Sequence, residues 1–135
     1  MSGDIIIMGI WDAEMTHKQS VIEILDYALN GQALAADIFS QNFRQYLNGN
    51  TLDLSEFHES IGRLRKKYVN VNLKILSMVS RENNVHSHHL VSVTENSGDV
   101  KKHEVFSRYE FSNNKVINCY ESLREISDLE ALGHL

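Results

Sequence analysis

Residues 69–75 read VNVNLKI, and apolar and polar side chains alternate along this stretch. A period of two places successive side chains on opposite faces of a β-strand. The same period continues to about residue 80 and returns over 85–94, 103–112 and 115–126, each stretch bounded by turn residues. Asn113-Asn114 suits a tight hairpin turn, because Asn tolerates positive φ. The second half is therefore predicted to be a four-stranded antiparallel meander.

The first half of the chain has mainly helical spacing. Apolar residues predict a helix over 16–30, with Thr16 as its N-cap and Asn30-Gly31 as its end. An alanine-rich stretch predicts a second, short helix over 32–39, and alternation predicts a strand over 42–47. After a turn at 48–50, a third helix is expected to open at Leu54, capped by Asp53 or Ser55. We expect the segment 1–13 to be loose, and the tail 127–135 to be frayed or a single helical turn.

Composition limits the classes of function. The chain has 135 residues, of which 42% are hydrophobic and 23% are charged, as in an ordinary globular protein. This length predicts one domain over 1–135. The net charge of −5 disfavours nucleic acid as a partner, because phosphate binding requires a basic surface. The apolar run Ile5–Trp11 is too short to span a membrane. The single cysteine, Cys119, has no partner for an intrachain disulfide, so we expect a cytoplasmic protein.

Alternation also divides the predicted sheet into two faces. The more apolar face is expected to turn toward the helices. It carries Val71, Leu73, Ile75, Val79, Val85, Ser87, His89, Val91, Val93, Val105, Ser107, Tyr109, Phe111, Ile117, Cys119, Glu121 and Leu123. The opposite face carries Asn72, Lys74, Leu76, His86, His88, Leu90, Glu104, Phe106, Arg108, Glu110, Val116, Asn118, Tyr120 and Ser122. A one-residue bulge would exchange these labels locally.

Helices followed by a long meander predict an α+β fold, a cone in which a curved antiparallel sheet wraps around three N-terminal helices. The sequence resembles the nuclear transport factor 2-like (NTF2-like) superfamily in its SnoaL-like (polyketide cyclase-like) branch. Four stretches carry the resemblance: FRQYLNG at 43–49, LSEF at 54–57, VHSHH at 85–89 and KVINCYE at 115–121. The order of elements matches over about 16–126.

The resemblance implies a pocket inside the cone. Members of the superfamily include ketosteroid isomerases, polyketide cyclases, dehydratases and transport factors, and the enzymes place a carboxylate or a His–Asp pair in that pocket. Tyr27 lies on the helix where the isomerases have a tyrosine, but the four predicted strands contain no Asp. Glu121 and His89 are the nearest substitutes for the cyclase pair. No specific catalytic pattern carries over, and a shared fold alone does not establish an activity.

The strongest candidate site combines His89, Tyr109 and Glu121, which alternation places on the inner face of three consecutive strands. A buried carboxylate must be hydrogen-bonded or protonated. Three readings are open. His89 and Glu121 could simply satisfy each other in the core, they could bind a ligand, or they could transfer protons in catalysis.

Other residues are candidates for a ligand pocket. Tyr27, Tyr46 and His58 could supply polar groups among the aromatic side chains of the helical half, and Phe43 could supply apolar surface. Cys119 is expected to point inward between Ile117 and Glu121, where an inert thiol is favoured because no basic residue adjoins it.

His86 and His88 share one face of a strand, as two metal ligands would. Only His103 and Glu104 could complete a site, and zinc requires three or four protein ligands, so we expect no metal and no other cofactor. The same face carries Leu90, Phe106 and Tyr120, which predicts a homodimer formed through the outer face of the sheet.

Three functions remain open. The first is a protein that binds a small apolar molecule in a pocket between helices and sheet. The second is a cofactor-free isomerase, cyclase or dehydratase that uses Glu121 and His89 for proton transfer. The third is a protein-interaction module.

Overall fold

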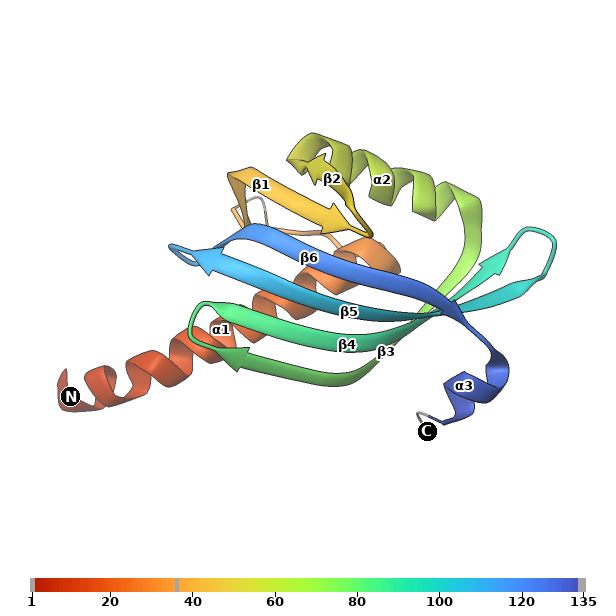
Figure 1. The fold of residues 1–135 in the computed structure, drawn as a ribbon. Helices are drawn as coiled ribbons and strands as arrows, with labels where there is room; N and C mark the ends of the chain where they lie inside the picture. Colours follow the sequence, from red (N-terminus) through yellow and green to blue (C-terminus); the bar gives the residue numbers. More distant parts are fainter. Residues whose placement is uncertain (1, 36, 134–135) are drawn as a thin grey trace.

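The computed structural model describes residues 2–35 and 37–133, with no side chain described for residues 2–12. Six strands form one sheet in the order β2-β1-β6-β5-β4-β3 (Figure 1). The elements in chain order are α1 (Ser2–Asn30), β1 (Phe39–Leu47), β2 (Asn50–Asp53), α2 (Leu54–Lys67), β3 (Tyr68–Arg81), β4 (Asn84–Glu95), β5 (Val100–Ser112), β6 (Lys115–Ile126) and α3 (Asp128–Leu132).

The long helix α1 begins at Ser2, well before the predicted start at Thr16. The segment expected to be loose contains no proline, so helix propagation from residues 16–30 continues back through it. The predicted end is confirmed, because Gly31 has φ of +71° and the N–H of Gln32 donates to the carbonyl of Asp26. Figure 1 shows the N-terminal part of α1 extending past the edge of the sheet.

The helix predicted over 32–39 is wrong, with residue 36 outside the described part of the chain. Residues 31–35 have no regular structure, and β1 begins at Phe39. Alanine favours a helix, but tertiary pairing prevails here. The carbonyl of Ile38 accepts from the N–H of Val116 on β6, and the side chains of Phe39 and Phe43 enter the core.

The helix α2 begins as predicted. Asp53 is the N-cap, its side chain accepts from the N–H of Glu56, and the Glu56 side chain accepts in return from the N–H of Asp53. Phe57 and Ile61, one turn apart, are buried against the core.

The four-stranded antiparallel meander is confirmed as β3–β6, and Asn113 and Asn114 both have positive φ. The complete sheet is mixed rather than antiparallel, because β1 pairs in parallel with β6. The expectation of three N-terminal helices is also corrected. Within the described residues α1 and α2 are the long helices, and the five-residue α3 lies near the C-terminus. The tail thus forms a short helix over 128–132.

Two bulges change the predicted faces of the sheet. The β3–β4 register shifts between Ile75 and Ser77, so Val79, predicted inward, is 58% exposed while Met78 packs against the core. The β5–β6 register skips Ile117, which brings Val116 into the core with no exposed surface. Alternation alone contains no signal for an inserted residue.

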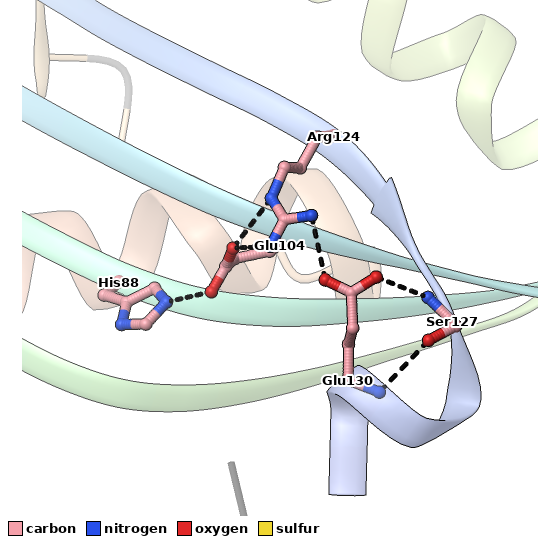
Figure 2. A network of polar contacts seen from close by, with 5 residues as sticks. All are labelled: His88, Glu104, Arg124, Ser127 and Glu130. Atoms are coloured by element: carbon pink, nitrogen blue, oxygen red, sulfur yellow. Dashed lines mark hydrogen bonds and ion pairs between the residues drawn. The ribbon is translucent and has the colours of Figure 1, made fainter. Parts of the chain in front are cut away.

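The outer face of the sheet holds a polar network that reaches α3 (Figure 2). Glu104, only 5% exposed, accepts from His88 at 2.9 Å and from the Arg124 guanidinium at 2.9 Å. Arg124 also contacts Glu130 on α3 at 3.0 Å, and Glu130 completes a capping box with Ser127. The network connects the short helix to the outer face.

Candidate functional site

A cavity of about 300 Å³ lies between α1, α2 and the inner face of the sheet. Its wall is mostly apolar, with Ile24, Phe57 and Val91 as examples from the two helices and the sheet. The predicted residues His89, Tyr109, Glu121, Phe43 and Cys119 all line it. A cavity of this size is at the lower end of the range for small-molecule sites.

Three other predicted ligand residues lie outside this cavity. The Tyr27 hydroxyl and His58 Nδ1 are 2.6 Å apart, in an exposed contact between α1 and α2. The Tyr46 ring stacks on Tyr120 with centroids 4.8 Å apart and borders an open groove on the outer face. Tyr46 points outward because it has the opposite parity to Phe43 on β1.

Glu121 accepts from two neutral donors inside the cavity. The Tyr109 hydroxyl and the Cys119 thiol both lie 3.4 Å from Glu121 Oε1. Burial raises the pKa of Glu121, and the donors Cys119, Tyr109 and Gln45 partly offset this rise by stabilising the carboxylate. Burial also raises the pKa values of Tyr109 and Cys119 well above their usual range. Both therefore remain protonated donors, and Cys119 lacks the lowered pKa of a reactive thiol.

His89 belongs to a separate polar pair. Its Nδ1 lies 3.1 Å from Ser87 Oγ, and its side chain is almost completely buried. Burial, and secondarily the charge of His88, lowers the pKa of His89 to about 4, so its imidazole is neutral at neutral pH. Of the two ring nitrogens, Nε2 is the one not engaged by Ser87.

His89 and Glu121 do not satisfy each other. His89 on β4 lies opposite Val105 on β5, and Glu121 on β6 lies opposite Ser107 on β5. The two residues are therefore two strands apart across the sheet and two residues apart along it. Strand spacing places the two positions about 12 Å apart. The described hydrogen bonds join each residue to other partners, so mutual pairing in the core does not explain their burial.

Gln45 and His103 are among the cavity-lining residues that were missed as site residues. Gln45 has the same parity on β1 as Phe43, and parallel pairing sets it beside Cys119 on β6. The sequence could have indicated Gln45, because it is a polar residue at a position of the strand that alternation assigns to the apolar face. His103, considered above only as a metal ligand, has the same parity on β5 as Tyr109 and also lines the cavity.

No cluster of three or more potential metal ligands occurs among the described side chains. His88, one of the histidines weighed as a ligand, instead hydrogen-bonds to Glu104 and stacks on Phe106 with ring centroids 4.1 Å apart. In the part of the chain that the structure describes, no helix is long and apolar enough to cross a membrane.

No protein-family model and no curated protein sequence matches the chain. Solved structures do. AclR, a putative hydroxylase from Streptomyces galilaeus, is 15% identical over 90% of this chain and 87% of its own, with a TM-score of 0.74. A putative SnoaL-like polyketide cyclase from Jannaschia sp. CCS1 is 13% identical over 89% of this chain and 90% of its own, with a TM-score of 0.71.

An NTF2-like protein of unknown function from Cytophaga hutchinsonii is 12% identical over 82% of this chain and 98% of its own, with a TM-score of 0.66. The chain has the NTF2-like fold. Identities this low establish the fold alone. In this NTF2-like chain, the cavity between the helices and the inner face is the candidate site.

Proposed function

We propose that this NTF2-like protein binds a small, uncharged and largely apolar molecule in the cavity between α1, α2 and the sheet. One observation carries the proposal: a mostly apolar cavity that is also lined by the polar side chains of Glu121, Tyr109 and His89. Such a combination is typical of small-molecule sites.

The charge of the wall supports an uncharged ligand. His89 is neutral at neutral pH, and burial shifts Glu121 toward its protonated form. No Lys or Arg side chain among the described residues lines the cavity. An anionic ligand would enter this site without a counter-ion, and an unpaired buried charge is costly. Hydroxyl and carbonyl groups can instead exchange hydrogen bonds with Glu121, Tyr109 and His89 Nε2.

The test uses the neutral fluorescent dye N-phenylnaphthylamine. The wild-type protein is expected to increase its fluorescence in a saturable way. Ala28 lines the cavity from α1, so Ala28→Phe fills space that the dye would occupy and should abolish the increase. The matched control is Ala33→Phe at an exposed position, which should bind like the wild type. Unsaturable binding, or full binding by Ala28→Phe, would contradict the proposal.

A second candidate function is cofactor-free acid–base catalysis by an isomerase, cyclase or dehydratase. The observation favouring it is that two titratable groups in one cavity have pKa values shifted by burial in opposite directions. A ligand lying between them could accept a proton from Glu121 and lose one to His89 Nε2. The names of AclR and of the Jannaschia protein are consistent with an enzyme, and the fold is compatible with other roles.

Deuterium exchange separates the two functions. β-Tetralone is an apolar ketone with acidic α-protons, and a general base in the cavity would accelerate replacement of these protons by deuterium in heavy water. Faster exchange with wild-type protein than with His89→Gln, followed by proton NMR, would support catalysis. Equal exchange rates, together with saturable dye binding, would leave binding as the function.

A further inference from the structure

Along β5 and β6 the polar groups of the cavity lie at two ends, and His89 on β4 lies beside the middle. At one end Gln45, Tyr109 and Glu121 gather where β1, β6 and β5 adjoin. At the other end His103 on β5 faces the same space, together with Tyr68 at the start of β3. No hydrogen bond joins the His103 side chain to another of the described residues, so its ring nitrogens are available to a ligand.

The strand register gives the separation of the two ends. Glu121 lies opposite Ser107, and His103 stands four residues before Ser107 on β5. At about 3.4 Å per residue and one strand spacing, the two positions are about 14 Å apart along the sheet. Between them β5 and β6 present only Val105 and Leu123 to the cavity, while His89 contributes its Nε2 from β4 at the side.

We infer that the ligand is an elongated, mainly apolar molecule with an oxygen function at each end, one received by Glu121 and Tyr109 and the other by His103. The inference rests on the proposed function and adds the ligand's shape and the spacing of its polar groups. His103 and Glu121 are both partly exposed. The apolar middle of the ligand covers Val105 and Leu123.

Linear alcohols and diols serve as molecular rulers. Alkanols and α,ω-diols from hexanol and hexanediol to dodecanol and dodecanediol are measured by displacement of N-phenylnaphthylamine. The ratio of diol to alkanol affinity is expected to reach a maximum at one chain length. His103→Phe keeps a ring but removes its hydrogen-bonding atoms. It should lower the affinity for the best diol about three- to tenfold, the value of one lost neutral hydrogen bond, and leave the alkanol of that length within about twofold.

Two further variants complete the test. His103→Gln restores a hydrogen-bonding group and should recover part of the diol affinity. His86→Phe, at an exposed position on the outer face, is the matched control and should change neither ligand. Equal effects of His103→Phe on diol and alkanol, or no optimal chain length, would overturn the two-ended ligand while leaving the cavity function intact. Failure of every alkanol and diol to displace a bound dye would overturn the inference as well, and failure of the dye itself to bind would overturn the proposed function.

Discussion

The hydroxyl of Tyr109 lies 3.4 Å from Oε1 of Glu121, and the two residues are twelve positions apart on neighbouring antiparallel strands. Tyr109 stands directly opposite Cys119, so Glu121 is one step further along β6 on the same face. Both neutral donors therefore meet one carboxyl oxygen. Gln45 is a third neutral partner of this carboxyl group, and no salt bridge to Glu121 occurs among the described residues, which is consistent with a group kept for a ligand.

Glu121→Gln should leave the fold intact and weaken ligand binding. The raised pKa means that folding favours the protonated form of Glu121. Protonated Glu121 therefore adds to the stability of the fold at pH values below its pKa in the unfolded chain, about 4.5. This contribution is lost as the pH rises through the higher pKa of the folded state. The variant should therefore melt at the same or a higher temperature than the wild type at neutral pH, and this relative gain should shrink in acid. Thermal melts at both pH values, paired with dye titration, measure this.

The opposite result would assign Glu121 a structural role. A clear loss of thermal stability at neutral pH, with dye affinity unchanged, would mean that the carboxylate mainly completes a buried hydrogen-bond network. Loss of a partner in such a network typically costs about 1–3 kcal/mol.

His89 should make the protein less stable in mild acid. Its folded pKa of about 4 lies below the usual 6.5, so the unfolded chain binds a proton more readily in this window. The contribution of His89 to the free energy of unfolding is fully present above pH 6.5 and falls as the pH decreases toward 4. The total loss from this group is up to about 3 kcal/mol. His89→Gln should reduce the fall in urea-unfolding experiments across this range. His86→Gln, at an exposed position, should reproduce the wild-type dependence, and identical curves for all three proteins would exclude the effect.

The outer sheet face should mediate a homodimer. Phe106 is 51% exposed there, and Tyr46 and Tyr120 border the same open groove. Large exposed apolar side chains gathered on one face are typical of an interface. Light scattering at micromolar concentration should give twice the chain mass, and Phe106→Glu should give the monomer mass. Val69→Glu changes a valine that is 66% exposed and should remain dimeric. A wild-type monomer would remove this proposal.

Local rules explain which parts of the fold could be predicted. The α2 cap depends on Asp53 and Glu56, and the last hairpin on Asn113-Asn114, all of them neighbours in sequence. The strands of the meander follow from alternation. The parallel pairing of β1 with β6 joins distant segments, and no local pattern encodes it.

Alternation assigned His89 and Glu121 to the correct face of the sheet, because no bulge shifts the register at their positions. Placement failed at the bulge near Ile117, where one extra residue reversed the face of Val116. It also failed for Tyr27, whose ring packs at the surface under the Arg65 guanidinium, 4.8 Å from its centroid. That contact depends on how α1 and α2 meet, which helical periodicity does not determine.

Arg124 should hold α3 beside the sheet. It joins Glu104 on β5 to Glu130 on α3 (Figure 2). Without it the helix keeps the Ser127 capping box and a contact between Lys102 and the exposed Asp128. The Arg124–Glu130 pair is exposed and contributes little. Glu104 is buried but keeps its contact with His88, so Arg124→Ala should lower the melting temperature only modestly. Local opening requires only that a few contacts break. Amide hydrogen exchange over 128–132 should therefore accelerate severalfold, while exchange in β4 and β5 stays unchanged. Arg63→Ala on α2 is the matched control and should leave α3 protected, whereas unchanged exchange in Arg124→Ala would show that Ala131 and the capping box hold the helix without the network.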